Sequence, residues 1–367
     1  MKKKESPLIA KCNKNYTIVQ GGAERNHLID VIKGVCILFV VFTHYDWSNE
    51  QWHKMLFPFW IDMAVPMFMI ISGYVGAMSF SRKGIEKLED AFAINSILSK
   101  CIRFLIPFLI AYLIEVCVEI FILKNNLTSL ILMFFTGGKG PGSYYFPVMI
   151  QFVFLFPFIY ICIQRKGFVG LIILFFVNAF YEFFQRIYGV NEQCYRLLLL
   201  RYIFVIAFGC YIYIKQQERI KKIWGFITFI IGTLFIFLVE YTTYEPKIII
   251  YWTRTSFIAC LYIIPIAYFV LRSKLKMQIY PLEILGKSSF NIFLTQMVYY
   301  SYATGFVYKY ISNVVLRNCV NLFICCSFGI LFYYFETRLT KKIIKYINMS
   351  DIRISNKINN LFLKKAL

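Results

Sequence analysis

The stretch ERNHLIDVIKGVCILFVVFTH (residues 24–44) decides the fold, because from Leu28 onward it is a long apolar run that carries three ionisable side chains, Asp30, Lys33 and His44. On a helix, Lys33 and His44 lie three turns apart and point the same way, about 16 Å apart along the axis. Asp30 lies one turn before Lys33 on nearly the same face. Each ionisable group at the centre of a membrane helix costs roughly 2.5 kcal/mol or more. Three of them on one face therefore predict a helix that borders a polar interior, and a functional site there.

The composition of the whole chain is that of a membrane protein. Of 367 residues, 59% are hydrophobic, 19% are aromatic and only 16% are charged, and the mean hydropathy is +0.62. A soluble domain of this size does not have such a composition. The amino-terminal MKKK is followed by polar residues rather than by an apolar stretch, so we expect no cleaved signal peptide. The sequence therefore predicts a multi-pass helical membrane protein.

Apolar stretches long enough to cross about 30 Å of hydrocarbon recur along the chain. They predict an all-α bundle of about ten transmembrane helices, at residues 28–45, 57–78, 104–123, 145–163, 168–184, 197–214, 223–240, 249–271, 284–302 and 318–336. The stretch 127–135 is too short to cross and is expected to lie at the interface. We expect one integral-membrane domain at 28–337, between a cytoplasmic N-terminal segment (1–27) and a basic cytoplasmic tail (338–367) that forms a surface-bound helix.

The distribution of lysine and arginine predicts the orientation of these helices. One alternating set of loops is rich in both residues, whereas the other set is lean apart from three arginines between residues 186 and 201. Both termini are therefore expected in the cytoplasm, and His44 is expected toward the outer end of its helix. The net charge of +21 then reflects topology and attraction to anionic lipid headgroups. A nucleic-acid partner is not expected, because no basic soluble face is evident.

Neither a metal ion nor a permanently bound cofactor is expected. The eleven cysteines fall mostly inside apolar stretches, without paired C-x-x-C motifs, and the three histidines lack the spacing of metal ligands. The glycine-rich segment GGKGPG (137–142) has the order of neither a Walker loop nor a dinucleotide fingerprint. We interpret it as a flexible turn that shapes the mouth of a cavity.

Five motifs occur in order along the chain. The first is the pair Lys33 and His44, and the others are VPMFMIISGY (65–74), KCIRFLIP (100–107), GPGSYYFPVMIQFVFLFP (140–157) and LEILGKSSFNIFLTQ (282–296). Together they resemble the acyltransferase-3 family of integral-membrane O-acyltransferases, of the bacterial surface-polysaccharide O-acetyltransferase type. Two positions depart from the family pattern, since Lys33 stands where Arg is commoner and Gln296 stands where the late motif often has His. Lysine lacks the bidentate fork of arginine, so phosphate or carboxylate recognition at Lys33 is expected to be looser.

The resemblance implies transfer of an acyl group, expected to be acetyl, from cytosolic acyl-CoA to a hydroxyl of a cell-surface polysaccharide or its lipid-linked precursor, at the plasma membrane. Such chemistry needs a base, a donor or cation for the developing oxyanion, and a basic surface for the phosphates of coenzyme A. His44 is the candidate base or transient acyl carrier. Lys33 either attracts a donor phosphate or pairs with Asp30 to hold the polar face together.

Further candidates for donor binding lie near the expected cytoplasmic ends of helices. Lys100 and Arg103 stand where the third helix enters the membrane, and they could hold the phosphates of acyl-CoA. The hydroxyls of Ser72 and Tyr74 could line the path of the donor thiol arm. Gly73 between them equally favours close packing of two helices.

Candidates for acceptor binding lie on the expected outer side. Tyr144 and Tyr145 could stack on a sugar ring, or they could belong to the aromatic belt at the membrane interface. Arg196 and Arg201 could clamp an anionic acceptor, or they could pair with Glu192 or another carboxylate.

Glu115 and Glu119, one turn apart in the third predicted helix, support a function of another class. They could form a proton or cation path in a secondary transporter or flippase of a glycan or lipid-linked substrate, or they could be counter-charges for buried lysine and arginine side chains. Broken helix halves and an inverted repeat, which many transporters contain, are not evident in the sequence. A non-catalytic scaffold or sensor is the third interpretation. Acyl transfer is the best account of the sequence, which leaves the acceptor and the oligomeric state open.

Overall fold

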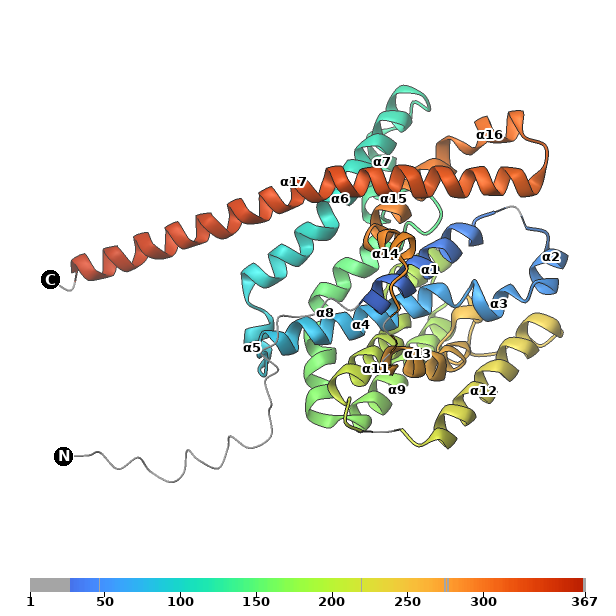
Figure 1. The fold of residues 1–367 in the computed structure, drawn as a ribbon, viewed down its shortest axis with the longest axis horizontal. Coiled ribbons are helices and arrows are strands. Elements are labelled where there is room, and N and C mark those ends of the chain that lie inside the picture. The colour runs from blue at the N-terminus through green and yellow to red at the C-terminus, as the bar shows by residue number, and fades with distance from the viewer. Residues whose placement is uncertain (1–26, 46, 219, 274, 276, 366–367) are drawn as a thin grey trace.

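The computed structural model is a bundle of helices (Figure 1). It describes residues 27–365 except 46, 219, 274 and 276, with side chains up to Tyr346. In this part of the chain every regular element is a helix, which confirms the predicted all-α class. The α-helices are α1 (His27–Thr43), α2 (Asn49–Lys54), α3 (Phe57–Trp60), α4 (Ala64–Arg82), α5 (Leu88–Ala91), α6 (Ile94–Phe121), α7 (Leu127–Phe135), α8 (Tyr145–Lys166), α9 (Phe168–Tyr188), α10 (Glu192–Leu197), α11 (Ile203–Ile214), α12 (Lys222–Tyr241), α13 (Ile263–Arg272), α14 (Tyr280–Lys287), α15 (Ser289–Tyr302), α16 (Thr304–Tyr310) and α17 (Val314–Lys365). Three short 3₁₀ helices accompany them, η1 (Leu199–Tyr202), η2 (Thr253–Thr255) and η3 (Ala259–Leu261).

Six helical stretches in the described part of the chain are long and apolar enough to cross a membrane. A seventh is obtained if η2, η3 and α13, which are bent by 59°, form one span. A helical membrane protein is therefore confirmed, whereas the count of about ten spans and the cytoplasmic position of both termini stay predictions. The three other predicted spans are short or interrupted. Helix α1 has 17 residues, the span 197–214 is divided between η1 and α11, and the span 284–302 is broken at Ser288.

Local sequence explains several helix boundaries. The side chain of Asn126 accepts a hydrogen bond from the Ser129 N–H at 3.0 Å, which caps the start of α7. Helix α7 coincides with the short apolar stretch 127–135 noted in the sequence. Gly167 lies between α8 and α9 with φ +52°, a region that glycine enters at little steric cost. A single run of apolar residues is thereby divided into two antiparallel neighbours.

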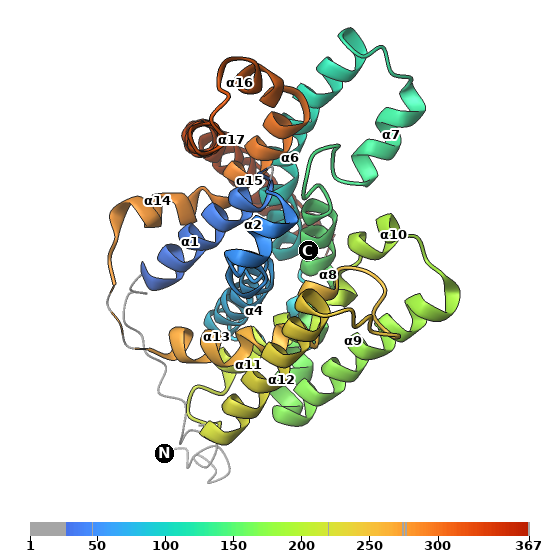
Figure 2. The ribbon, with the colours of Figure 1, turned by 90° about the vertical axis from the view of Figure 1, so that its right-hand side faces the viewer.

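Helices α4 and α11 form the centre of the bundle (Figure 2). Every residue from Ile203 to Ile212 of α11 is buried, as expected for a helix that is apolar on all sides. The two helices touch backbone to backbone at two glycines. A Cβ atom added at Gly73 would lie 2.0 Å from the Ile206 carbonyl oxygen, and one at Gly209 would lie 1.8 Å from the Ile70 carbonyl oxygen. The packing role considered for Gly73 is therefore observed.

Helix α14 packs in the same close manner along α1. A Cβ atom at Gly34 would lie 2.1 Å from the Leu282 carbonyl oxygen, and one at Gly286 would lie 1.8 Å from the Asp30 carbonyl oxygen. The break after α14 then turns the chain into α15, which packs against both α1 and α17. The first helix is thus enclosed between the central helix α4 and the α14–α15 segment (Figure 2).

The last helix, α17, continues without a break from residue 314 to residue 365 and extends far beyond the rest of the bundle (Figure 1). The predicted tail 338–367 is therefore helical up to Lys365, but it continues the last span instead of starting a separate helix. Its position on the membrane surface stays a prediction.

Candidate functional site

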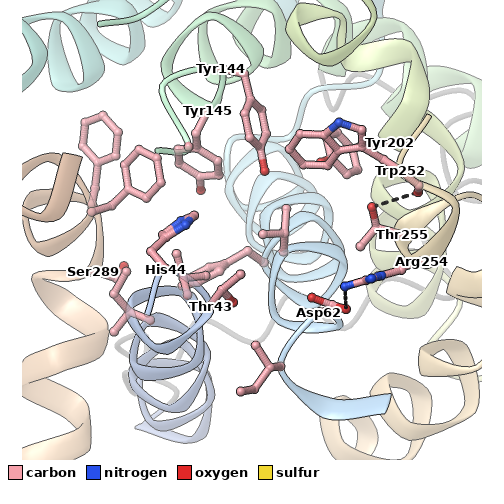
Figure 3. A pocket seen from close by; sticks show the side chains of 18 of the residues that line it. Thr43, His44, Asp62, Tyr144, Tyr145, Tyr202, Trp252, Arg254, Thr255 and Ser289 are labelled. Carbon is pink, nitrogen blue, oxygen red and sulfur yellow. Dashed lines mark hydrogen bonds and ion pairs between the residues drawn. The ribbon is translucent and has the colours of Figure 1, made fainter. Parts of the chain in front are cut away.

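A cavity of about 370 Å³ lies where α1, the start of α4, the loop before α8, η2 and α15 meet (Figure 3). We call it the His44 cavity. The polar, charged and indole side chains that line it are Thr43, His44, Asp62, Tyr144, Tyr145, Tyr202, Trp252, Thr253, Arg254, Thr255 and Ser289. Its other walls are apolar, mostly aliphatic and phenylalanine side chains. Such a cavity, apolar with a few convergent polar groups, is typical of a small-molecule site.

His44 follows the last residue of α1, and its imidazole projects into the cavity close to Tyr145 (Figure 3). The backbone N–H of His44 still donates to the Val41 carbonyl oxygen at 3.3 Å, so the residue is held by the end of the helix. On one side the Tyr300 ring lies 6.2 Å from the imidazole, centre to centre. On another side the imidazole faces Gly142, where a Cβ atom would lie 4.0 Å from Nε2. The imidazole therefore borders the cavity between α15 and the loop before α8.

Aromatic side chains form one wall of the His44 cavity. Tyr144 and Trp252 meet edge to face at 5.2 Å, and Tyr145 lies 4.9 Å from Phe293. Both tyrosines are thus members of the cavity wall, as Figure 3 shows. Aromatic rings presented in this way can stack on the apolar face of a sugar or on another flat ligand.

Arg201 supports this wall from behind. Its guanidinium carbon lies 4.6 Å from the Tyr202 ring centre and 4.7 Å from the Trp252 ring centre. An Nη2 hydrogen bond to the Thr255 hydroxyl, at 2.9 Å, anchors the guanidinium. Arg201 is only 2% exposed and does not line the cavity itself. Contacts of this kind between a cation and aromatic faces fix the orientation of the rings.

A polar pair stands at another side of the same cavity, across from His44 (Figure 3). The carboxylate of Asp62 and the guanidinium of Arg254 approach to 3.9 Å, measured from Oδ2 to Nη1. Arg254 also donates from Nε to Glu240 at 2.9 Å. His53 in turn approaches Glu240 at 3.6 Å. The pair therefore belongs to a charged cluster that joins the start of α4, η2, α12 and α2.

A second cavity, of about 280 Å³, adjoins the first and contains most of the predicted donor-binding residues. We call it the Lys33 cavity. Lys33 of α1, Ser72 of α4, and Lys100 and Arg103 of α6 line it together. The residues shared by the linings of both cavities are Phe68, Tyr145, Ser289 and Phe290. The two cavities therefore meet at this group of side chains.

A third hollow, the Lys83 cleft, continues from the Lys33 cavity. Lys83 at the end of α4 and residues of the α5–α6 region line it, and its volume is about 710 Å³. The cleft shares Ser79, Lys100 and Arg103 with the Lys33 cavity. Two cationic side chains of α6, Lys100 and Arg103, thus stand where the cleft meets the cavity, and Lys83 lines the cleft itself. This arrangement is suited to a phosphate-bearing ligand.

The GGKGPG loop reaches the His44 cavity through Gly142, and two glutamates hold it. The Lys139 ammonium lies 2.8 Å from Glu119, and the backbone N–H of Lys139 donates to Glu115 at 3.3 Å. Glu119 also accepts hydrogen bonds from the Tyr302 hydroxyl, at 2.5 Å, and from the Asn125 amide. The glutamate pair noted in the sequence therefore anchors the loop to α6 and α15.

The remaining predicted site residues line none of these three cavities, and they are Asp30, Tyr74, Arg196, Arg201 and Gln296. The Tyr74 ring packs edge-on against Tyr213 at 5.3 Å, so it belongs to the contact between α4 and α11. Gln296 is fully buried on α15, and neither end of its amide has a hydrogen-bond partner in the described part of the chain. The backbone of Asp30 contacts Gly286 of α14.

Asp62 and Arg254 were not among the predicted site residues, although the sequence contains a signal for each. Both residues are ionisable and lie inside predicted spans, at 57–78 and 249–271, where a charged side chain is expensive. Trp252 and Thr255 carried no such signal, because a tryptophan or a threonine near a helix end is common in membrane proteins. Their part in the cavity follows only from the position of η2.

The described residues contain no group of three or more histidine, cysteine, aspartate or glutamate side chains placed to hold a metal ion. Within the same residues the cysteines are free thiols, and Cys36, Cys210, Cys260 and Cys325 are buried as small hydrophobic side chains.

Comparison with known proteins agrees with the family resemblance that the sequence motifs indicated. The family model described as an acyltransferase domain matches residues 26–336. All residues that line the three cavities fall in this range except Ile344 of the Lys83 cleft. No curated protein and no solved structure matches the chain.

Proposed function

Because the chain belongs to the acyltransferase-3 family of membrane acyltransferases, we propose that it moves an acetyl group from cytosolic acetyl-CoA to a hydroxyl of a cell-surface glycan. The acceptor is a polysaccharide or its lipid-linked precursor. The plasma membrane is the proposed location, because a cytosolic donor and a surface glycan meet only across that membrane.

The observation that carries this proposal is the series of three adjoining cavities. It begins at the Lys83 cleft, passes Lys33, Lys100 and Arg103, and ends at His44. Coenzyme A has phosphates at one end and its thiol at the other, joined by a long narrow arm. A series of cavities with cations at one end and an imidazole at the other matches that shape and charge.

The cationic residues hold the donor in this proposal. Lys83, Lys100 and Arg103 bind the phosphates, and the pantetheine arm passes Ser72 and Lys33. The thioester then lies where the Lys33 cavity meets the His44 cavity, beside Tyr145 and Ser289. Hydroxyl groups at that junction can donate hydrogen bonds to the oxyanion that develops on the thioester carbonyl.

The acceptor approaches from the opposite side, against the aromatic wall. His44 takes the proton of the acceptor hydroxyl while the hydroxyl oxygen attacks the thioester carbon. The new C–O bond forms, the C–S bond breaks, and the proton passes from the imidazolium to the sulfur of coenzyme A. The products are the acetyl ester and free coenzyme A. If His44 is acylated first, the net reaction is the same.

Transfer of labelled acetyl groups tests the proposal. Purified protein in detergent receives radiolabelled acetyl-CoA and surface glycan that has been stripped of ester groups with base. We expect label in the glycan with wild-type protein and a loss of at least about 100-fold with His44→Ala, as is usual when a general base is removed. His27→Ala is the matched control, because His27 lines none of the cavities. Full activity of a well-folded His44→Ala protein would contradict the assignment.

The same assay separates the enzyme from the transporter alternative, because a transporter moves its substrate but does not transfer label in detergent. The transporter alternative depends on Glu115 and Glu119 as an ion path. Their observed contacts, three donors on Glu119 and the Lys139 backbone on Glu115, favour a structural role for both.

A further inference from the structure

The carboxylates of Asp62 and Glu240 both lie near the guanidinium of Arg254, beside the His44 cavity. Arg254 makes its short contact with Glu240, at 2.9 Å, whereas its distance to Asp62 is 3.9 Å. The longer distance exceeds that of a hydrogen bond. The carboxylate of Asp62 is therefore near a cation without being hydrogen-bonded to it.

The Asp62 side chain is largely buried, and one of its two carboxylate oxygens lacks a hydrogen-bond partner in the described part of the chain. It is 9% exposed, and its Oδ2 atom accepts no hydrogen bond from any residue that the structure describes. It does not cap the helix that follows, because Met63 is the N-cap of α4 and no side chain caps that end. The indole N–H of Trp52 is a polar neighbour of the Asp62 carboxylate, but neither Trp52 Nε1 nor Asp62 Oδ2 makes a hydrogen bond of normal geometry within the described residues. A buried polar atom left without a partner is unfavourable, so it indicates a missing partner.

The surroundings of Asp62 specify the chemistry of that partner. Asp62 lines the His44 cavity with its Oδ2 atom covered, so a rotation of the carboxylate lets a ligand in that cavity supply the partner. A hydroxyl group donates one hydrogen bond and accepts another, so a single hydroxyl can bridge Asp62 and Arg254 across their 3.9 Å gap. The aromatic wall formed by Tyr144 and Trp252 suits the apolar face of a sugar ring.

We propose that Asp62, oriented by Arg254, binds a hydroxyl of the acceptor sugar other than the one that is acylated. This proposal rests on the proposed function. The acylated hydroxyl faces His44 and a second hydroxyl of the same sugar unit faces Asp62, so the pair selects which sugar and which hydroxyl reacts. A site built to hydrogen-bond a substrate hydroxyl discriminates strongly against substrates that lack it.

The experiment compares Asp62→Asn with wild type in the labelled-acetyl assay, using de-esterified surface glycan as the acceptor. Asparagine keeps the shape of aspartate and removes its charge. We expect kcat/KM for the glycan to fall about tenfold, mainly through KM, because the neutral amide oxygen of asparagine accepts a weaker hydrogen bond than the charged carboxylate does. The KM for acetyl-CoA and the slow hydrolysis of acetyl-CoA by water, both measured without glycan, stay within about twofold of wild type. Glu50→Gln is the control, since Glu50 is exposed on α2 and, among the residues that the structure describes, forms its ion pair with Lys54.

Three results would overturn the proposal or separate it from the proposed function. An unchanged KM for glycan with a lower Tm would mean that Asp62 serves only the fold, for example as an acceptor for Trp52. An equal loss of donor hydrolysis and glycan transfer would mean that Asp62 acts in the reaction itself rather than in acceptor binding. Full activity of His44→Ala would refute the proposed function first. If Asp62→Asn does not fold, Arg254→Lys retains Asp62 and one positive charge, and a rise in KM confined to the glycan is again the expected result.

Discussion

Replacing Gly73 by alanine tests whether the central contact between α4 and α11 holds the cavities in place. A Cβ atom at this position would lie 2.0 Å from the Ile206 carbonyl oxygen, whereas real Cβ atoms essentially never come closer than 3.0 Å to a neighbour. The two helices must therefore separate locally by about 1 Å or more. The obstacle is backbone, which cannot rotate away as a side chain can.

The expected loss of stability follows from that displacement. Overpacking a dense core typically costs about 1–3 kcal/mol. For a protein of 367 residues each kcal/mol lowers Tm by about 1.3 °C, so we expect a decrease of roughly 1–4 °C. Activity should fall as well, because Phe68 and Ser72 of α4 line the cavities and would shift with the helix. A 1 Å misplacement can lower a rate about 100-fold.

Thermal unfolding of the purified protein in one detergent measures this effect. Gly305→Ala is the matched control, because a Cβ atom there meets nothing within 4 Å. Gly209→Ala should resemble Gly73→Ala, and the double variant should lose less than the sum of both, since the two glycines share one helix contact. Equal Tm values for Gly73→Ala and Gly305→Ala would refute the reasoning.

Two further predictions concern the donor end and the loop anchor. Lys100→Ala with Arg103→Ala should raise the KM for acetyl-CoA about tenfold or more and leave the KM for glycan unchanged, because both cations line the donor side only. Initial rates at varied acetyl-CoA measure this, and an unchanged donor KM would argue against the proposed phosphate site. Glu119→Gln should lower stability by about 2 kcal/mol, since the side chain is 3% exposed and loses its charged contact with Lys139, which is itself 50% exposed and can turn to water. Thermal unfolding of Glu119→Gln and Lys139→Met, each compared with wild type, tests this prediction. If neither variant changes Tm, Glu119 does not anchor the loop.

The sequence by itself predicted where most of the helices lie, because the length and apolarity of a membrane segment determine whether it can be a spanning helix. The stretch 127–135 coincides with α7, and the predicted span 168–184 lies within α9. The sequence did not predict the break at Ser288 or the 59° bend between η3 and α13. Such breaks depend on the packing of neighbouring helices, for example the close contact of α14 with α1, and hydropathy carries no information about packing.

The candidate site was accessible to the sequence only in part. A charged or imidazole side chain inside an apolar stretch is costly, and such a residue can be recognised from the sequence alone. This criterion identified Lys33, His44, Lys100 and Arg103. Asp62 meets the same criterion, but the sequence did not indicate a function for it, because its partner Arg254 lies far away in the chain. The sequence left two interpretations of Glu119 open, an ion path and a counter-charge, and the contacts with Lys139, Tyr302 and Asn125 favour the second.

The sequence alone thus determined the class of the protein and the set of polar residues that a membrane interior would not carry without a function. Only the tertiary structure decided which of those residues face one another. Three residues from different helices, Lys33, Ser72 and Lys100, line one cavity. The side chains of Tyr74 and Gln296 are instead packed in the interior between helices. The physical reason is that the rotation of each helix is set by backbone contacts such as those at Gly34 and Gly73, which exist only after the helices have packed.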